Sequence, residues 1–272
     1  MDLTIARIED RLLVISQKVG APAYDFDFGL NFSCTHPFQF REYELCILRI
    51  GPVAPYEEEY AEKAEWGLRL VNSPEEHYRA SELEGWYPLI SDLTAATRVF
   101  DELPSASVVE SEFGWPVFVK GSRQTSKHNP DLSVAHNADE YSLLCEAYHH
   151  DPILHWQRPA VRQFVDLDPL SGSVPNKVRP SREFRTFWWN RDLVGCGHYW
   201  YQLPAYGAAD LDAGLSLARE AARRVSVPFL VVDIARKADG GWIVIECNDA
   251  QEAGYVGLSP HILWRNILDR VE

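Results

Sequence analysis

Three oxygen-bearing side chains stand within apolar sequence near the end of the chain. Asp233 interrupts the run FLVVDIA, and Glu246 and Asn248 belong to the run WIVIECN. A carboxylate is costly to place against a core unless a partner compensates its charge. The pattern therefore indicates either a site that binds a cation or an ordinary solvated sheet face.

The two runs are predicted to pair as a β-hairpin. Asp239-Gly240 lies between them and is a dipeptide typical of two-residue turns. With that turn, Asp233 lies directly opposite Glu246, and Asn248 shares the face of Glu246 because side chains alternate along a strand. The other face is expected to form core and carries Val232, Ile234, Ile245 and Cys247. A turn longer by one residue would change this register.

Carboxylates that face each other on paired strands repel, and a hard divalent cation removes that repulsion. Mg2+ is the first choice for a set of carboxylate and amide oxygens. We therefore predict that Asp233, Glu246 and Asn248 hold Mg2+. The alternative, from the hairpin alone, is a solvated face that carries ordinary polar residues.

Two cationic residues lie on apolar strands further upstream. Lys120 ends the run PVFVK and leads into the polar segment GSRQTSKHNP. A lysine beside hydroxyl and backbone donors suits a polyphosphate, whereas the alternative for a lone lysine is a solvated strand end. Arg185 has aromatic neighbours and needs an anion, either an internal carboxylate or a phosphate. Arg179 or Arg182 could share that task.

The composition is that of a folded protein without a strongly basic surface. Of the 272 residues, 46% are hydrophobic and 24% are charged, and the formal net charge is −14 at pH 7. This charge argues against nucleic acid or an anionic membrane as a bulk partner. The five cysteines are scattered and form no disulfide framework. The charged N-terminus and the lack of a long apolar run lead us to expect a cytoplasmic protein.

The segments that carry these residues show helix and strand patterns in turn. A strand over 44–51, a helix over 56–67 and a strand over 68–74 predict a small parallel sheet within residues 1–91. Ser73 is expected to cap the short helix that follows. Further along we expect helices over 92–104, 138–150 and 211–225, and strands over 115–122, 158–167 and 181–201.

The order of these features resembles the ATP-grasp superfamily over roughly residues 92–257. The most specific part is VVDIARKADGGWIVIECNDAQEAGY, which is similar to the metal-binding hairpin of those ligases. The resemblance implies an α/β (α+β) ATP-grasp fold in which ATP is held between two sheet-containing subdomains. It also implies a pre-grasp N-terminal α/β domain, a central subdomain and a C-terminal subdomain with the metal site, over residues 1–91, 92–162 and 163–272.

The same resemblance implies roles for individual residues. Lys120 would contact the phosphates of ATP, and Arg185 would lie close to the transferred phosphate, so both are predicted to be catalytic. Backbone groups of a hinge strand would contact adenine, and Asp166 or Asp168 would reach the ribose. The predicted nucleotide contacts are Lys120, Ser122, Gln163, Phe164, Val165 and Asp168. Only Arg98 lies near the place where the family usually has another ATP-contacting lysine.

The resemblance implies an ADP-forming ligase that uses ATP and Mg2+. ATP would phosphorylate a carboxylate, and an amine or a similar nucleophile would then attack the acylphosphate. The substrates would be a small molecule or peptide with a carboxylate, together with an amine acceptor. The alternatives are an ATP-dependent kinase on the same fold and a nucleotide-binding protein without catalysis. The complete set of metal ligands favours an enzyme, because a binding protein needs no second carboxylate.

Overall fold

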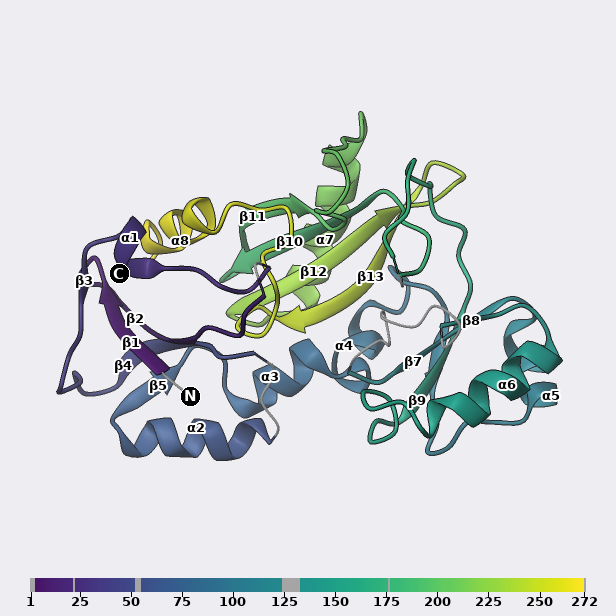
Figure 1. The fold of residues 1–272 in the computed structure, drawn as a ribbon, viewed down its shortest axis with the longest axis horizontal. Helices are drawn as coiled ribbons and strands as arrows, with labels where there is room; N and C mark the ends of the chain where they lie inside the picture. The colour runs from purple at the N-terminus through teal and green to yellow at the C-terminus, as the bar shows by residue number, and fades with distance from the viewer. Residues whose placement is uncertain (1–2, 22, 52–54, 124–132, 176, 272) are drawn as a thin grey trace.

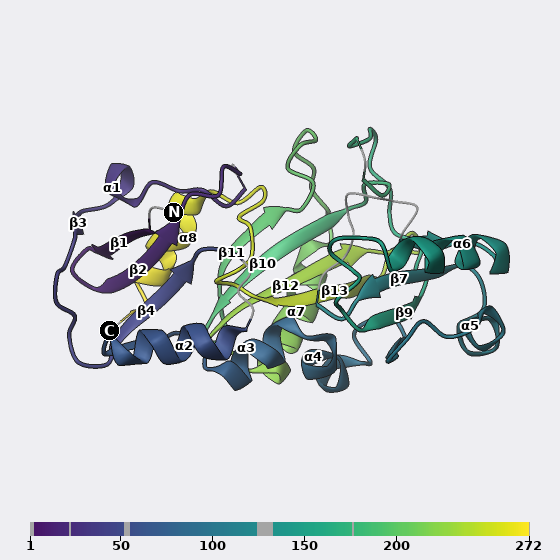
Figure 2. The ribbon, with the colours of Figure 1, turned by 60° about the horizontal axis from the view of Figure 1, so that its bottom comes forward.

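Three β-sheets lie one after another along the long axis of the molecule (Figure 1). The computed structural model describes residues 3–21, 23–51, 55–123, 133–175 and 177–271. In chain order these are an N-terminal, a central and a C-terminal sheet, and the C-terminal sheet lies between the other two (Figure 2). The sheets follow the order of the three predicted subdomains, whose boundaries stay predictions.

The N-terminal sheet has five strands in the order β3-β1-β2-β4-β5. The helix α2 connects β4 to β5, and the two strands run parallel, which confirms the predicted β–α–β unit. Ser73 caps α3 through a capping box with Glu76, as the sequence predicts. The elements are β1 (Leu3–Ile8), β2 (Leu12–Gln17), α1 (Phe28–Asn31), β3 (Cys34–Thr35), β4 (Glu44–Arg49), α2 (Tyr56–Glu65), β5 (Leu68–Leu70) and α3 (Pro74–Ser81).

The central sheet is antiparallel, with the strand order β6-β9-β7-β8. The helix predicted over 92–104 is wrong, because this segment contains the strand β6, which pairs with β9. Thr97 and Val99 are β-branched, and pairing with β9 outweighs the weak helix preference of the segment. The elements are α4 (Leu83–Ile90), β6 (Thr97–Val99), α5 (Ala106–Phe113), β7 (Val117–Gly121), β8 (Val134–Ala135), α6 (Ala138–Tyr148) and β9 (Pro159–Gln163).

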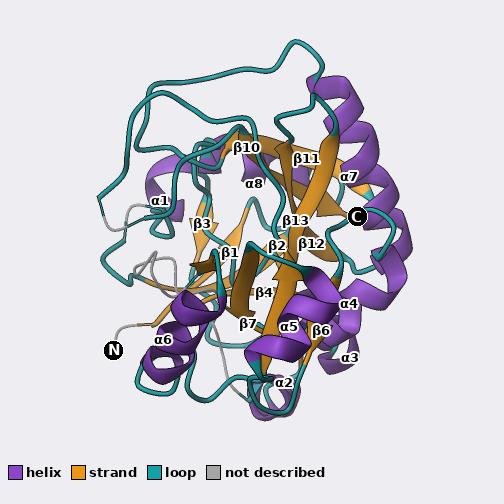
Figure 3. Ribbon diagram, turned by 90° about the vertical axis from the view of Figure 1, so that its right-hand side faces the viewer, coloured by secondary structure: helices purple, strands orange, loops and turns teal. Residues whose placement is uncertain are grey.

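The C-terminal sheet is antiparallel, with the strand order β11-β10-β12-β13. Its elements are β10 (Glu183–Trp189), β11 (Asp192–His198), α7 (Leu211–Val225), β12 (Phe229–Arg236), β13 (Trp242–Asp249) and α8 (Pro260–Leu268). The helix α7 covers one face of this sheet, where Ala218 and Ala221 pack against Val232 and Ile234 (Figure 3). The other face packs at one end on α8 and the N-terminal sheet, and carries polar residues at the other end.

The hairpin of β12 and β13 confirms the predicted pairing of Asp233 with Glu246. The turn is longer than predicted, because the N–H of Lys237 donates to the carbonyl of Gly241 at 2.7 Å, which leaves residues 238–240 in the turn. The predicted two-residue turn at Asp239-Gly240 is therefore wrong. A second irregularity restores the register before Glu246 is reached.

That irregularity is a β-bulge on β13 at Ile245. Ile234 pairs with Val244 instead of Ile245, and the register shifts between Asp233 and Ile234. The bulge adds one residue to β13, which offsets the extra residue in the turn. Val244 is 1% exposed and takes the core position predicted for Ile245, whereas Ile245 points to the opposite side and lines a cavity.

The cysteines and the helices bear on redox state and membrane contact. All five cysteines are free. Within the described ranges, every helix is too short or too polar to cross a lipid bilayer.

Candidate active site

Two carboxylates and two cations meet on the open face of the C-terminal sheet. Arg185 lies directly opposite Asp233, and its Nε and Nη2 donate to the two carboxylate oxygens at 2.8 and 2.7 Å. Glu246 lies 4.0 Å from Nη2 of Arg185 and accepts a hydrogen bond at 3.3 Å from Nζ of Lys120. The structure thus brings together four predicted site residues from four strands of two sheets.

These four charges balance one another in a buried location. Asp233 and Lys120 are only 1% and 3% exposed. Burial alone would lower the pKa of Arg185, but the ion pair with Asp233 outweighs it and raises the pKa, so Arg185 remains cationic. Arg185 and Lys120 therefore compensate the repulsion between Asp233 and Glu246 that the sequence predicted for this pair.

Two cavities meet at Glu246. The hinge cavity has a volume of about 460 Å³ and lies between the central sheet, β13 and the segment 163–167. The loop cavity has a volume of about 410 Å³ and lies between β10, the segment 199–202 and the loop of residues 252–256. Glu246 lines both cavities. A molecule in one cavity can therefore approach a molecule in the other beside this carboxylate.

The hinge cavity combines apolar walls with cationic side chains. Four predicted nucleotide contacts line it, namely Lys120, Gln163, Phe164 and Val165. The apolar walls include Phe118, Val134, Leu167, Ile243, Val244 and Ile245. A cavity of this size with a few polar groups at fixed positions is typical of a site for a planar organic ligand.

Two predicted nucleotide contacts lie outside the lining of the hinge cavity. Asp168 accepts a hydrogen bond from Nε of Arg182 at 2.9 Å, and this bond lowers the pKa of its carboxyl group. The Oγ of Ser122 donates to Glu82 at 3.4 Å. Asp166, the alternative to Asp168 for the ribose, does line the cavity. We therefore transfer the ribose prediction from Asp168 to Asp166.

Arg162 is a candidate that the sequence analysis missed. It lines the hinge cavity, and its Nε and Nη1 donate to Thr97 Oγ1 at 2.9 Å and to the carbonyl of Ile245 at 2.7 Å. Its Nη2 is buried without an acceptor, and burial lowers the pKa of its guanidinium. Arg98, by contrast, pairs with Glu112 at 2.9 Å and has 58% of its side chain exposed. The signal in the sequence was the charged residue in the apolar run PAVRQFV.

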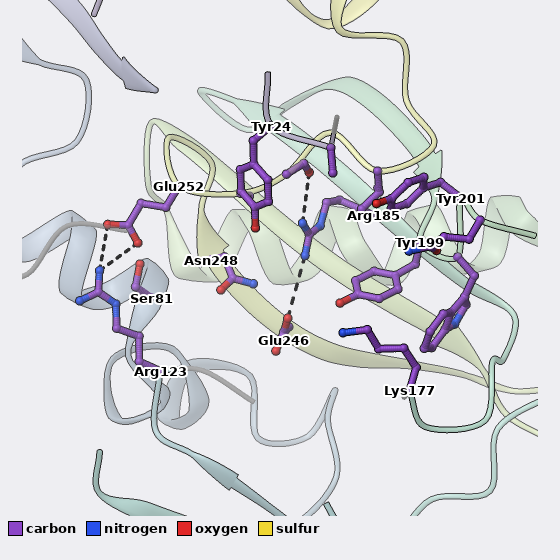
Figure 4. Close-up of a pocket in the computed structure, with 16 residues that line it drawn as sticks. Tyr24, Ser81, Arg123, Lys177, Arg185, Tyr199, Tyr201, Glu246, Asn248 and Glu252 are labelled. Atoms are coloured by element: carbon purple, nitrogen blue, oxygen red, sulfur yellow. Dashed lines mark hydrogen bonds and ion pairs between the residues drawn. The ribbon is translucent and has the colours of Figure 1, made fainter. Parts of the chain in front are cut away.

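Tyrosine and charged side chains line the loop cavity (Figure 4). Tyr24 and Tyr199 project into it from opposite parts of the chain, and Asn248 lies beside Glu246. On the far side, Nη2 of Arg123 donates to both carboxylate oxygens of Glu252 at 2.8 and 2.9 Å. The wall therefore offers groups of both charges to a bound molecule.

The predicted metal ligands offer a set of oxygen atoms that suits Mg2+. Glu246 and Asn248 line the loop cavity, and Asp233 uses one acceptor position on each of its oxygens for Arg185. A carboxylate has about four such positions, so Asp233 retains others for a cation. Among the described residues, no three His, Cys, Asp or Glu side chains gather as a metal site. The candidate set instead consists of two carboxylates and one amide.

This geometry suits transfer of a phosphoryl group between two bound molecules. Lys120 and Arg162 bring fixed positive charge to the hinge cavity, and Arg185 brings it to the loop cavity. Fixed cations of this kind stabilise the negative charge that spreads over a transferring phosphoryl group. Two adjacent cavities would hold donor and acceptor close to each other, which reduces the entropic cost of their reaction.

Comparisons with known proteins agree with this arrangement. Residues 79–267 match the model of a family described as an ATP-grasp domain, the third family of its clade. No curated protein sequence matches the chain. Similar solved structures include a RimK domain protein ATP-grasp from Sphaerobacter thermophilus, which is 17% identical, covers 84% of this chain and 80% of its own, and has a TM-score of 0.58.

Two further similar structures are ligases by their titles. The D-alanine–D-alanine ligase from Bacillus anthracis, complexed with ATP, is 12% identical, with 83% of this chain and 78% of that chain covered and a TM-score of 0.58. The VanG D-Ala:D-Ser ligase from Enterococcus faecalis is 13% identical, with 84% and 71% covered and a TM-score of 0.59. At these identities the similarity concerns the fold alone.

Proposed function

The chain belongs to this family of ATP-grasp domains, and we propose that it is an ATP- and Mg2+-dependent ligase. It joins a carboxylate to an amine or a similar nucleophile through an acylphosphate, and releases ADP and phosphate. The observation that carries this proposal is the meeting of two cavities at Glu246, beside Lys120 and Arg185.

In this proposal the hinge cavity holds ATP. Its apolar walls accept the base, and the backbone of residues 163–165 offers hydrogen bonds to the edge of the adenine. Asp166 is the acceptor for the ribose hydroxyls. Lys120 and Arg162 contact the phosphates, which supply the acceptor that Nη2 of Arg162 lacks among the described residues.

Mg2+, when bound, compensates the charge of the terminal phosphates. Glu246 and Asn248 hold it, together with the remaining acceptor positions of Asp233. Arg185 stays fixed by Asp233 and stabilises the negative charge of the phosphoryl group as it leaves the nucleotide side. Its bidentate ion pair sets the direction of the guanidinium, so little reorganisation is needed during transfer.

The loop cavity holds the carboxylate substrate and the amine. Its position next to Glu246 brings a bound carboxylate to the end of the phosphate chain. The titles of two structures with the same fold, a D-alanine–D-alanine ligase and a D-Ala:D-Ser ligase, support the same general reaction for this chain. Tyr24 and Tyr199 shield the site on two sides, which protects an acylphosphate from water.

A substrate screen that monitors ADP release tests this function. Pools of carboxylates are offered with and without pools of amines, in the presence of ATP and Mg2+. ADP release that requires both pools supports the ligase. ADP release without any amine, together with a stable phosphorylated product, replaces the ligase by a kinase. Absence of turnover with every pool, in a protein that binds ATP, contradicts both enzymes.

A further inference from the structure

The loop of residues 250–254, which follows β13, is held by arginines from all three parts of the molecule. Arg185 of the C-terminal sheet donates from Nη1 to the carbonyl of Gly254 at 3.1 Å. Arg123, which follows β7 of the central sheet, pairs with Glu252. The third arginine, Arg49, ends β4 in the N-terminal sheet and reaches the loop from the other side.

Arg49 makes the densest of these contacts. Its Nη1 donates to the carbonyls of Ala250, Gln251 and Ala253 at 2.9, 2.9 and 2.8 Å. The guanidinium carbon lies 4.5 Å from the ring centroid of Tyr255. Three carbonyls of one short loop can converge on one nitrogen only if the loop curves around it. The loop therefore takes its shape from a side chain that belongs to another sheet.

Arg49 is an expensive way to fill this space. It is 7% exposed, and its Nε and Nη2 are buried without an acceptor. In the part of the chain that the structure describes, it has no carboxylate partner, so the loop carbonyls and the face of Tyr255 compensate its charge. An apolar side chain would avoid the cost of burying an unpaired charge. The charge therefore has a use other than stability.

A second contact fixes the same loop to the N-terminal sheet. The Oε1 of Gln251 accepts a hydrogen bond from the backbone N–H of Leu48 at 3.0 Å, and its Nε2 donates to the hydroxyl of Tyr56 at 3.0 Å. The side chain of Gln251 is 2% exposed. The loop and the N-terminal sheet are therefore held at two neighbouring points, one on each side of the loop backbone.

The contact between Gly254 and Arg185 connects this loop to the proposed chemistry. The carbonyl of Gly254 is one of three oxygens that fix the guanidinium, the other two being those of Asp233. We propose that Arg49 is a positioning residue, which sets the loop 250–254 and, through Gly254, the place of Arg185 beside Glu246. The position of the loop is independent of the reaction, whereas the catalytic consequence rests on the proposed function.

Hydrogen exchange measured by mass spectrometry tests the structural half of this proposal. In Arg49→Lys, the amides of residues 251–257 should exchange at least about ten-fold faster than in the wild type, with β7 and β10 unchanged. Asn72→Ala is the matched control, because Asn72 joins the same part of the chain to Phe229 by hydrogen bonds of 2.9 and 3.0 Å and does not contact the loop backbone. Unchanged loop exchange in Arg49→Lys, or an equal increase in Asn72→Ala, overturns the proposal.

Kinetics tests the catalytic half. With substrates from the screen, Arg49→Lys should release ADP at least about ten-fold more slowly, while its affinity for Mg2+ and a non-hydrolysable ATP analogue stays within about two-fold of the wild type. Unchanged turnover despite faster loop exchange overturns the link to Arg185. Arg49→Met repeats both measurements without the charge, and the lysine variant decides if the methionine variant does not fold. If the wild type itself never releases ADP, the proposed function fails and the exchange result still stands.

Discussion

At the scale of single residues, Glu246 lies where the two cavities meet. Its carboxylate accepts from Lys120 at 3.3 Å and lies 4.0 Å from Arg185. The same group is a predicted ligand of Mg2+. Its negative charge therefore serves both the buried ion-pair network and the proposed reaction, and the two roles predict different consequences for a substitution.

Glu246→Gln keeps the volume of the side chain and removes its charge. We expect ADP release to fall by at least about a hundred-fold, because the cation loses a charged ligand at the point of phosphoryl transfer. We also expect a loss of about 1–3 kcal/mol in the free energy of unfolding, because the cations Lys120 and Arg185 lose part of their compensation. ADP release and chemical denaturation measure the two effects. Wild-type turnover in this variant would contradict the assigned role.

Arg162 and Arg98 form a matched pair for the second cation of the nucleotide site. Arg162→Gln should weaken ATP binding by about 1.5–3 kcal/mol, because one charge-assisted contact with a phosphate is lost. Arg98→Gln should leave the affinity unchanged, because that side chain is exposed and paired with Glu112. Calorimetric titration with a non-hydrolysable ATP analogue measures both. Equal affinities for the two variants would rule out Arg162 as a phosphate contact.

The sequence predicted some of these residues and not others for a physical reason. Asp233 and Glu246 could be paired because one hairpin contains both, and strand alternation is a local rule. Arg162 could not be assigned, because its partners Thr97 and Ile245 come from two other elements that are distant in sequence. Asp166 and Asp168 could not be separated, because the ion pairs of Asp168 form only in the folded protein.

At the scale of elements, the hairpin shows how two irregularities leave one pairing intact. The three-residue turn shifts the register by one, and the bulge at Ile245 shifts it back before Asp233 is reached. The bulge also turns Ile245 toward the hinge cavity and gives its carbonyl to Arg162 at 2.7 Å. Sequence alternation alone could not reveal the bulge, because the pairing of Asp233 is the same with and without it.

The bulge predicts opposite effects for two neighbouring substitutions. Val244→Ala should lower the free energy of unfolding by about 1–3 kcal/mol, because Val244 is 1% exposed and packs in the core under α7. Ile245→Ala should cost less stability but weaken ATP binding, because Ile245 lines the hinge cavity. Urea denaturation and calorimetric titration of both variants measure this. A larger loss of stability in Ile245→Ala would restore the core position that a two-residue turn implies.

Strand β6 illustrates a limit on predicting elements from local patterns. Its partner β9 lies about sixty residues further along the chain, and the pairing is antiparallel at the edge of the central sheet. A helix preference within 92–104 is local, whereas the stabilising partner is not. The β4–α2–β5 unit was predictable, because short segments that alternate between strand and helix carry the whole pattern.

At the scale of the whole molecule, the three sheets meet around the loop 250–254 and the buried carboxyl group of Asp249. Asp249 is 0% exposed, its backbone N–H donates to Oγ of Ser81, and its Oδ1 accepts from the backbone of Gln251 at 2.8 Å. Burial, and next to it the charge of Glu252, raises the pKa of Asp249 to about 6. This carboxyl group therefore links the stability of the junction to pH.

The sign of this linkage follows from the raised pKa. The folded protein binds the proton of Asp249 more tightly than the unfolded chain, whose pKa is near the ordinary value of 3.8. The contribution to stability is therefore complete below the ordinary value and is lost as the pH rises through about 6. Between about pH 5 and about pH 7.5 the loss amounts to about 1–2 kcal/mol.

Asp249→Asn separates this local effect from the charge of the whole molecule. The formal net charge of −14 also shrinks as the pH falls toward the isoelectric point near 5.1, which stabilises the wild type and the variant alike. We therefore expect the wild type to gain about 1–2 kcal/mol more than Asp249→Asn when the pH is lowered from about 7.5 to about 5. Urea denaturation of both proteins across this range measures the difference. Parallel curves would show that Asp249 ionises normally in the folded protein, and the junction would then be insensitive to pH at this residue.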